Sequence, residues 1–532
     1  MASESAQSLR QKRQRLIKDI LADPLHGKRI YLLGSAEFGP TNEPTLVKST
    51  VGLHSKFGTQ GTLIDAFHAI KYTNKNNQIY LVKTTGEHAI AYLNVNIDGG
   101  EIEENAFILA SCQSNEIYND IQIIIDIDRL TFRFPKDLGL RDISYIYKDY
   151  HNISTLAQAI NADTKNKKNC VNAHYMVDPS IPIQNAFFPV NPTSIYLYGG
   201  QCGLNYSKNL LYNCLNFTYS LLESTEIDII IPVDAMLDDI YPDDEEGHAE
   251  RYNMRYYQKE RDYLTMDALE NKLSFMNQLI NFCIIQLNSG IITNGIIGFN
   301  SSYKYWSYYL SEADDIAEMY SACYQYNLKQ CENPFYAFLV SAVAGDIMYN
   351  KGTIIDNGCY AYAALCASTK YLEGTTNIPI SNTIRIWHEF SEDVLKDMAD
   401  QGIVTFRHSP FYKTPVVYSG VTCGSSDNEN LRLYCNVRMI QYAISHLNRL
   451  FQFYIGYNMY ELVKEKTIHN DIGTILSTLK NVGIITAFEY RIVPYYAKGH
   501  IIVYLTMMTN YMVKSVKLST TINIEFLEEM DE

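Results

Sequence analysis

Residues Ile227–Pro232, IDIIIP, decide the fold, because such a short and nearly continuous apolar run is typical of a strand buried on both faces of a sheet. Helices are expected on either side, over Leu204–Glu223 and Asp262–Asn288, with further strands over Ile195–Tyr198 and Gly295–Phe299. The order strand, helix, strand, helix, strand predicts a mostly parallel sheet with right-handed crossovers and flanking helices. The expected fold class is α/β, with more than one domain.

The chain before this region also alternates between strand and helix patterns. Strands are expected at Arg29–Leu33, Gln78–Thr84 and Ala89–Val95, with a helix at Leu63–Lys71. Residues 100–190 favour β-structure, and Asp120–Phe134 (DIQIIIDIDRLTFRF) includes the strict alternation of a half-exposed antiparallel strand. The Lys- and Asn-rich stretch Asn161–Asn172 is expected to be a loop.

The last third of the chain predicts a mixed α+β domain. The expected helices are Glu392–Gln401, Val437–Phe453 and Tyr460–Leu479, and the expected strands are Val416–Val421, Phe488–Val493, His500–Met508 and Met512–Ile524. The predicted organisation is an N-terminal arm (1–25), an N-terminal α/β segment (26–99), a β-rich peripheral domain (100–190), a middle α/β domain (191–410), a C-terminal α+β domain (411–515) and a C-terminal arm (516–532).

The composition favours protein partners over nucleic acid. The 532 residues carry a formal net charge of −15, whereas a nucleic-acid-binding protein needs a basic surface. Charged residues make up only 19% of the chain and there are 43 Tyr, a bias found in the cores of protein interfaces. We therefore expect extensive protein–protein contact and no nucleic-acid partner.

The cysteines and the apolar stretches bear on the cell compartment. There are 11 Cys and no C-x-x-C pair, and five of them lie among apolar residues: Cys202, Cys214, Cys359, Cys366 and Cys435. These are expected to be reduced, buried side chains, and a zinc site is the alternative. Because reduced cysteines are typical of the cytosol, we expect the protein to be synthesised in a reducing cytosol. No apolar signal segment is visible near the N-terminus, and the longest apolar stretch, Phe335–Ala344, is too short to span a bilayer, so no direct membrane insertion is expected.

A search for catalytic motifs finds no complete signature. Gly199–Gly203 could cradle a phosphate, but it lacks the Lys and Ser/Thr of a P-loop and fits a tight turn. The acidic run Asp238–Glu246 could bind a cation or form a solvated loop, and it lacks EF-hand spacing. His388 and His408 stand without a visible nucleophile partner. We therefore predict no catalytic residues, no metal site and no cofactor.

The order of short motifs resembles the contractile phage tail sheath protein family from about residue 29 to residue 528. Near the N-terminus the matches are Ile30–Gly34, Gly39–Pro44, Phe57-Gly58, Leu63–Ala66 and Ile79–Lys83. In the middle they are Gly199-Gly200 with Gly203, Ile231-Pro232 and Gly295–Gly298, and later Asp400–Ile403, Tyr418–Thr422 and Asn436–Arg438. Tyr418 stands where the family usually has Trp, which marks a divergent member.

The resemblance implies a structural protein and not an enzyme. It implies a middle domain of subtilisin-like topology, with residues 416–524 joining residues 29–95 in the domain nearest an inner tube. Subunits of this family stack as hexameric rings in a helical polymer, and contraction drives the tube through a host envelope. The implied partners are other copies, the tail tube protein, and baseplate and tail terminator proteins, and the implied location is the virion. The sheath of a bacterial contractile injection system, an α/β hydrolase and a monomeric ligand-binding protein remain as alternatives.

Two groups of residues are the candidate assembly sites. The inter-subunit arms carry opposite charges at the two ends of the chain, with a strand-forming stretch, Lys517–Phe526, available to extend another subunit's sheet. The arm residues are Arg10, Lys12, Arg13, Arg15, Lys18, Ile522, Ile524, Glu525, Phe526, Glu528 and Glu529. The tube-contact candidates are Lys464, Lys466 and Lys480, on or beside the predicted helix Tyr460–Leu479, since the family uses a helix of this domain to touch the tube.

Overall fold

The structure is a computed structural model, and it divides the chain into two compact units, Met1–Ile455 and Gly456–Glu532. The residues that it describes are 15, 28–97, 101–187, 194–204, 208–235, 275–291, 293–299, 328, 331–349, 354–370, 373–386, 389–425, 429–464, 466–495 and 499–509. None of the helices in these ranges is long and apolar enough to cross a membrane.

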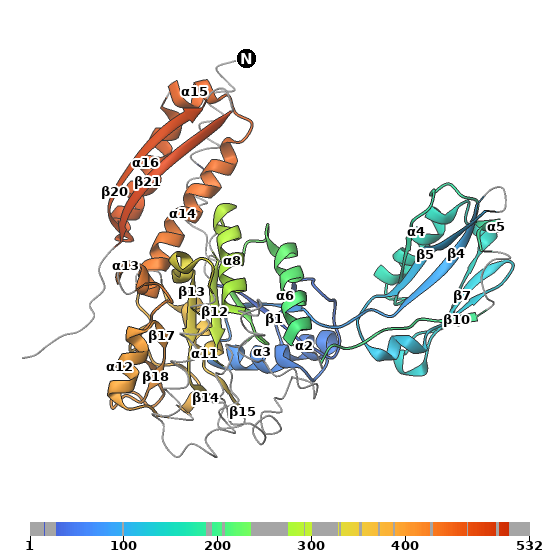
Figure 1. Ribbon diagram of the computed structural model, residues 1–532, viewed down its shortest axis with the longest axis horizontal. Coiled ribbons are helices and arrows are strands. Elements are labelled where there is room, and N and C mark those ends of the chain that lie inside the picture. The colour runs from blue at the N-terminus through green and yellow to red at the C-terminus, as the bar shows by residue number, and fades with distance from the viewer. Residues whose placement is uncertain are drawn as a thin grey trace, which may run out of the picture. The chain divides into compact units, whose positions relative to one another are not determined.

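A seven-stranded sheet forms the centre of the first unit (Figure 1). Its order is β17 (Ile403–Val404), β13 (Val340–Val343), β12 (Asn294–Gly298), β11 (Ile229–Pro232), β1 (Arg29–Gly34), β3 (Gln78–Lys83) and β2 (Thr45–Val47). All neighbours run parallel except β2, which is antiparallel to β3. Every residue of β11 is buried, as the IDIIIP run predicts, because helices cover both faces of the sheet.

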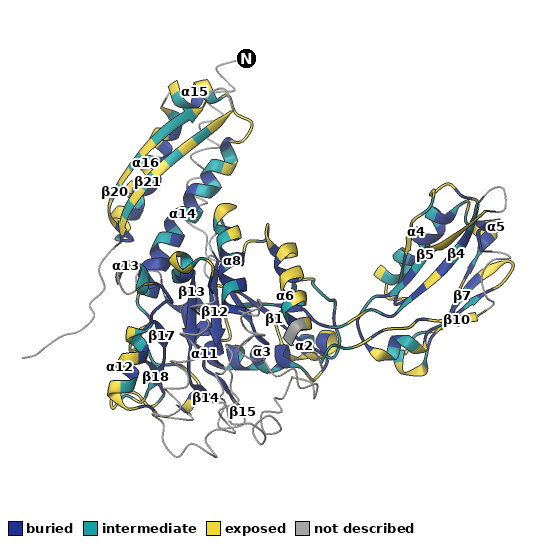
Figure 2. Cartoon of the chain, in the orientation of Figure 1, coloured by how far each residue is buried: buried dark blue, intermediate teal, exposed yellow. Residues whose placement is uncertain are grey.

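Helices pack on each face of this sheet, and its strands alternate between two cores (Figure 2). Ile230 of β11 points into one core, which contains residues of α6 (Lys208–Leu222), α8 (Phe275–Asn288) and α12 (Glu392–Asp400). Ile229 and Ile231 point into the other, which contains residues of α2 (Thr50–Phe57), α3 (Thr62–Thr73) and α11 (Cys359–Ser368). The unit is therefore a three-layer α/β structure.

The observed sheet differs from the predicted domain division in two places. β1 and β3 were expected in a separate N-terminal segment, but they pair in the central sheet, with Leu32 opposite both Ile231 and Leu81. The predicted strand at Ile195–Tyr198 was expected in the parallel sheet, but β10 (Ser194–Tyr196) pairs antiparallel with another sheet, Ile195 opposite Ile123. The pairing partner of a strand is set by long-range packing, which a local pattern does not contain.

The β-rich region, which lies between β3 and α6 along the chain, has its own core of buried side chains. One sheet has the order β10, β6 (Gln122–Ile125), β7 (Arg129–Arg133) and β8 (Ile143–Ile146). The other contains β4 (Ile90–Ile97), β5 (Glu101–Ser111) and β9 (Val171–Tyr175), so the predicted strand at Ala89–Val95 belongs here. The region also holds η1 (Glu116–Asp120), η2 (Lys136–Leu138), η3 (Tyr147–Asp149), α4 (Ile153–Lys165) and α5 (Ile183–Ala186).

Two sequence expectations for this region need correction. Asp120–Phe134 is not one strand but an antiparallel pair, β6 and β7, with a turn at Asp126–Asp128 where Ile127 is 72% exposed. The alternation continues through this turn and therefore did not mark it. Asn161–Asn172 is not all loop, because α4 continues to Lys165 from a capping box formed by Asn152 and Thr155.

The remainder of the first unit consists of short strands and one long helix. β14 (Asp346–Tyr349), β15 (Ile354–Asn357) and β16 (Thr383–Ile386) form a small antiparallel sheet, and β18 (Phe406–Arg407) pairs with β19 (Val416–Val417). The predicted strand Val416–Val421 is therefore shorter than expected. η4 (Pro334–Leu339), α13 (Glu429–Arg432) and α14 (Tyr434–Tyr454) complete this part of the chain.

The second unit is a small α+β unit. It contains α15 (Met459–Lys464), α16 (Thr467–Val482) and a hairpin of β20 (Ile485–Tyr495) and β21 (His500–Thr509). The unit begins at Gly456, so it is smaller than the C-terminal domain expected from residue 411. The strand expected at Met512–Ile524 lies outside the described residues.

Candidate assembly surfaces

The hairpin of β20 and β21 is the main candidate surface for assembly. Its strands pair antiparallel from Ile485 opposite Thr509 to Tyr495 opposite His500. No further strand pairs with either of them in the described part of the chain. Each strand therefore presents one outer row of backbone donors and acceptors, the kind of edge to which another chain can add a strand.

One face of the hairpin packs on α16. The Tyr490 hydroxyl donates to the carbonyl of His469 over 2.9 Å, and the Tyr490 and His469 rings lie 5.0 Å apart. Gly473 leaves room for this contact, because a Cβ there would lie 3.2 Å from the Tyr490 oxygen. Gly483 then ends the helix in the left-handed conformation, with φ of 86°, and directs the chain into β20.

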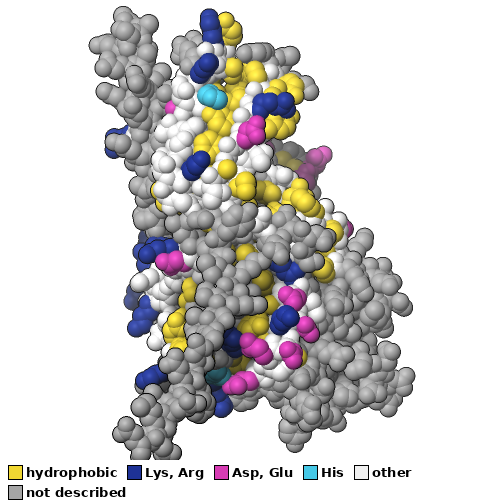
Figure 3. Space-filling view, turned by 90° about the vertical axis from the view of Figure 1, so that its left-hand side faces the viewer, with side chains coloured by type: hydrophobic (Ala, Val, Ile, Leu, Met, Phe, Trp, Pro, Cys, Tyr) yellow, Lys and Arg dark blue, Asp and Glu magenta, His cyan; other side chains and the backbone are white. Residues whose placement is uncertain are grey.

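The opposite face of the hairpin is exposed and carries several large apolar side chains. Tyr495, Ile502, Tyr504 and Met508 are each 41–50% exposed. In Figure 3, hydrophobic side chains gather toward the top of the view, where this unit lies. Pro494 of β20, opposite Ile501, has no backbone N–H and is a residue that sheets accept on an edge strand. We call the exposed side chains of Tyr495, Ile502, Tyr504 and Met508 the outer face.

The three candidate tube-contact lysines do not form one cluster. The predicted helix Tyr460–Leu479 is in fact two helices, α15 and α16, because Lys466 adopts the left-handed conformation with φ of 54°. Lys464 is exposed, with its Nζ 5.1 Å from the centroid of the Tyr460 ring, and Lys466 is exposed at the break. Lys480 is exposed in the last turn of α16, about 20 Å from Lys466 along the helix axis.

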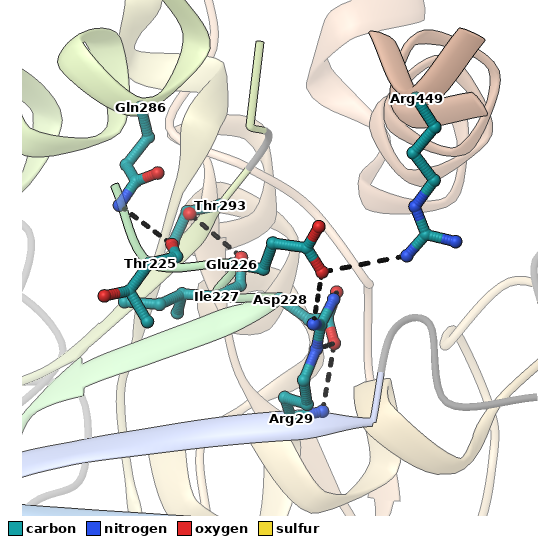
Figure 4. Close-up of polar contacts among 8 residues, drawn as sticks. All are labelled: Arg29, Thr225, Glu226, Ile227, Asp228, Gln286, Thr293 and Arg449. Atoms are coloured by element: carbon teal, nitrogen blue, oxygen red, sulfur yellow. Dashed lines mark hydrogen bonds and ion pairs between the residues drawn. The ribbon is translucent and has the colours of Figure 1, made fainter. Parts of the chain in front are cut away.

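A charged cluster ties the starts of two central strands to α14 (Figure 4). Arg29 Nε donates to Asp228 over 2.9 Å and Arg29 Nη1 donates to Glu226 over 2.7 Å, while Arg449 of α14 lies 3.7 Å from the same Glu226 carboxylate. Burial lowers the pKa of the Arg29 guanidinium, but the hydrogen bonds and charges of Asp228 and Glu226 more than offset this, so the net shift is upward.

Amide side chains extend the attachment of α14 to the central sheet. Gln441 and Asn294 exchange hydrogen bonds through their amide groups, with Gln441 Nε2 donating over 2.6 Å. Asn448 donates to the carbonyl of Gly290. Beside the charged cluster, Thr293 Oγ1 donates to the carbonyl of Ile227 over 2.9 Å (Figure 4). The contacts at Asn294 and Gly290 hold residues of α14 against the start of β12. The ion pair of Arg449 with Glu226 likewise holds α14 near the start of β11.

Two loop segments connect the central sheet to the β-rich region, and we call them the junction (residues 84–89 and 198–203). They pair through an antiparallel bridge between Glu87 and Gln201, and Tyr198 forms a second bridge with Ile90 at the start of β4. Gly203 packs so closely that a Cβ there would lie 2.3 Å from the Gly86 nitrogen. Beside the junction, the fully buried Lys83 donates from Nζ to the carbonyl of Ser114 over 2.9 Å.

Comparison with known proteins finds no matching family model and no matching curated protein. Among solved structures, a sheath tail protein from Listeria innocua is 11% identical, with 94% of this chain and 98% of that chain covered and a TM-score of 0.49. A sheath tail protein from Desulfitobacterium hafniense is 10% identical, with 91% and 96% covered and a TM-score of 0.46. The helical sheath of the anti-feeding prophage in its contracted state is 11% identical, with 56% and 93% covered and a TM-score of 0.34.

This chain resembles contractile tail sheath proteins. The three structures named above are sheath proteins by their own descriptions.

The arms expected from the sheath resemblance fall largely outside the described residues. Of the eleven arm residues, only Arg15 is described, and it is exposed. The acidic run Asp238–Glu246 and His388 are also outside the described ranges. His408 lies 3.2 Å from the carboxylate of Glu389, and no group of three or more His, Cys, Asp or Glu side chains suited to a metal occurs among the residues described.

The glycine turn at Gly199–Gly203 has a packing role. Gly200 N–H donates to Asn119 Oδ1 over 2.8 Å, and the Cys202 N–H donates to Glu116 over 3.1 Å. With Gly203 pressed against Gly86, these contacts account for the turn as part of the junction. The sequence had no local signal for the junction or for the Arg29 cluster, since their partners lie far apart along the chain.

Proposed function

We propose that this chain is the structural subunit of a contractile tail sheath. It polymerises as stacked hexameric rings around an inner tube and contracts to drive the tube through the host cell envelope. The observation that carries the proposal is the β20–β21 hairpin, whose two outer edges have no partner strand among the described residues. A two-stranded sheet is marginal by itself, so paired edges would stabilise it.

The strand that would fill an edge is available in the sequence. Lys517–Phe526, KLSTTINIEF, has β-forming residues with partial alternation and lies close to the end of β21 along the chain. Given by one copy to the hairpin of the next, this segment makes backbone hydrogen bonds that hold the two together. The backbone hydrogen bonds supply most of the binding free energy, because each exposed ion pair contributes only about 0–1 kcal/mol. The acidic residues that follow the segment and the basic residues of the N-terminal arm therefore act mainly to select the partner and the register.

The composition agrees with a chain whose main task is assembly. Low charge and many tyrosines suit repeated contacts with other copies, with the tail tube, and with baseplate and tail terminator proteins. The proposed location is the tail of a virion, after synthesis in the host cytoplasm. Catalysis, a metal and a cofactor have no place in the proposal.

Electron microscopy of the purified protein tests the proposal directly. We expect rings or long cylinders from the full chain. The double variant Ile522→Pro with Ile524→Pro should leave a folded monomer that does not polymerise, because proline removes backbone donors from the incoming strand. Glu532→Pro, beyond the strand-forming stretch, is the matched control and should assemble normally.

Deletion of either terminal arm is a second test of the sheath proposal. Removing residues 516–532, or residues 1–20, should give protein with unchanged circular dichroism that fails to form tubes. Normal tubes from either truncated chain would contradict the arm exchange. A stable monomer of the full chain at high concentration, together with esterase or peptidase turnover, would contradict the sheath proposal and favour a hydrolase.

The sheath of a bacterial contractile injection system is a closely related alternative. It would use the same hairpin, arms and tube contact, so the experiments above apply to it unchanged. The genes beside this one separate the two cases, because a phage tail is encoded with capsid and packaging proteins and an injection particle is not.

A further inference from the structure

Two cysteines face each other just beyond the ends of β5 and β9. Ser111 is paired with Val171, and the next residue, Cys112, donates its N–H to the carbonyl of Cys170 over 2.8 Å. At the other end of the same strands, Met176 donates to Ala106 over 2.9 Å in the same register. Cys112 and Cys170 therefore occupy a hydrogen-bonded pair position of the antiparallel ladder.

This position brings the two cysteines within reach of a disulfide. The Cα atoms of such a pair are about 5.5 Å apart, and a disulfide joins Cα atoms separated by roughly 4.4–6.8 Å. The Cβ atoms of a hydrogen-bonded pair are about 5.5 Å apart, roughly 1 Å more than in a disulfide, so the bond requires a small closure of the two chain segments just beyond the strand ends. Residues directly opposite each other project to the same side of a sheet, so the two thiols share one face. Cys170 is buried and Cys112 is half-buried, and both are reduced in this structure.

The surroundings of the pair are well packed. Tyr118 belongs to η1 and is buried in the core of the β-rich region, and its hydroxyl donates to Gln113, the residue after Cys112, over 3.3 Å. Burial raises the pKa of the Tyr118 hydroxyl, and the thiols of Cys112 and Cys170 raise it further.

We propose that Cys112 and Cys170 form an intramolecular disulfide when the protein leaves a reducing cytosol for an oxidising exterior. An external disulfide such as oxidised glutathione is the oxidant. The Cys112 thiolate, being more exposed, attacks it and releases one glutathione, and the Cys170 thiolate then attacks the Cys112 sulfur and releases the second. The two electrons reduce one oxidised glutathione, and the two protons lost by the protein thiols are taken up by the two glutathione thiolates that leave.

The move to an oxidising exterior rests on the proposed function, whereas the disulfide itself would cross-link the β-rich region whether or not the chain forms a sheath. It closes the loop from residue 112 to residue 170, which contains β6, β7, β8 and α4. A loop of this length restricts the unfolded chain strongly. Burial raises the pKa of both thiols, so the exchange should be slow at neutral pH and faster toward pH 9.

The test uses the full chain treated with oxidised glutathione at pH 8.5. Mass mapping of unreduced peptides should find Cys112 linked to Cys170, with two thiols lost per chain. The unfolding transition of the β-rich region should rise by roughly 10 °C and return when dithiothreitol is added. A linkage between other cysteines, or a glutathione adduct on Cys112 that never closes, would overturn the proposal.

Serine variants test whether Cys112 and Cys170 are the two cysteines that form the disulfide. Cys112→Ser and Cys170→Ser should each abolish the linked peptide and the shift in melting temperature. Cys214→Ser, which removes another half-buried thiol on α6, should retain both. Because the linked peptide is measured in the unmodified chain, the conclusion holds even if a serine variant folds poorly. Unchanged thiol content of the unmodified chain after prolonged exposure would count against the proposal.

Discussion

Arg491 of β20 and Tyr504 of β21 are registered partners, and the guanidinium carbon lies 4.9 Å from the centroid of the tyrosine ring. Both residues are on the side of the hairpin turned away from α16, where Tyr504 is 48% exposed. The cation covers one ring of the outer face and so links the two strands, to which no third strand is paired in the described part of the chain. Such a contact contributes about 0.5–1 kcal/mol at an exposed site.

Arg491→Ala should therefore loosen the hairpin without unfolding the chain. We expect amide hydrogen exchange in β20 and β21 to accelerate about two- to fivefold, as a loss of about 0.5–1 kcal/mol requires. Arg129→Ala is the control, since Arg129 is an exposed arginine on β7 that pairs with its neighbour Asp128. Equal exchange in the two variants would show that the Arg491–Tyr504 contact does not stabilise the hairpin.

The two carboxylates around Arg29 should differ sharply in their effects. Asp228→Ala removes a partner that is 6% exposed and leaves the Arg29 charge inside, which should cost about 3 kcal/mol. Glu226→Ala removes the second carboxylate, which is 52% exposed and lies 2.7 Å from Arg29 Nη1, and should cost only about 1 kcal/mol. Urea denaturation of both variants measures this difference. Similar losses would contradict the assignment of Asp228 as the main partner of Arg29.

A methyl group at Gly203 should disrupt the junction. Gly203→Ala places a Cβ 2.3 Å from the Gly86 nitrogen at a positive φ of 71°, so we expect a loss of more than about 2 kcal/mol. Gly199→Ala is the matched control, because Gly199 also has a positive φ, 80°, but has open space around its Cβ position. It should cost only about 1 kcal/mol. Thermal unfolding and limited proteolysis within residues 84–89 report both effects.

Lys83 should make stability depend on pH in the alkaline range. Burial lowers its pKa to about 8, whereas the unfolded chain keeps a value near 10.5. Between these values the unfolded state binds more protons, so stability rises with pH from about 8 to about 10.5. The gain should be on the order of 2–3 kcal/mol. The difference in unfolding free energy between Lys83→Met and the unmodified chain, measured across this range, should show this slope, and a flat difference would contradict it.

The tube-contact lysines can now be tested in two places. Lys464→Glu with Lys466→Glu changes the break between α15 and α16, while Lys480→Glu changes the far end of α16. If charge steers docking on the tube, the double variant should slow tube-templated assembly at low salt and recover at high salt. Turbidity and electron microscopy at two salt concentrations measure this. Unchanged assembly in both variants would remove the lysines from the tube contact.

Local patterns were sufficient for much of the central architecture. The run Ile227–Pro232 predicted a strand buried on both faces, and the helices around it predicted a parallel sheet, because both signals lie within one window of sequence. Membership of the sheet was not predictable in this way. The sequence of β1 is compatible both with pairing to β11 and with a strand of a separate domain. Only the long-range pairing of Leu32 with Ile231 shows that β1 belongs to the central sheet.

The candidate site was predictable only in outline. The hairpin strands followed from alternation at Phe488–Val493 and His500–Met508, but the helix before them was expected to be continuous. The break at Lys466 has no Gly or Pro to mark it, and the apolar spacing continues through it. The link between Arg449 and Glu226 joins residues more than two hundred positions apart, so no local pattern could reveal it.

Pro494 makes the two edges of the hairpin chemically unequal. The edge of β21 offers an unbroken row of backbone groups along His500–Thr509, whereas β20 contains one residue that cannot donate. A strand that fits one edge is therefore not interchangeable with a strand that fits the other. A subunit built in this way has a direction, and an assembly made from such subunits would grow with distinct front and rear ends.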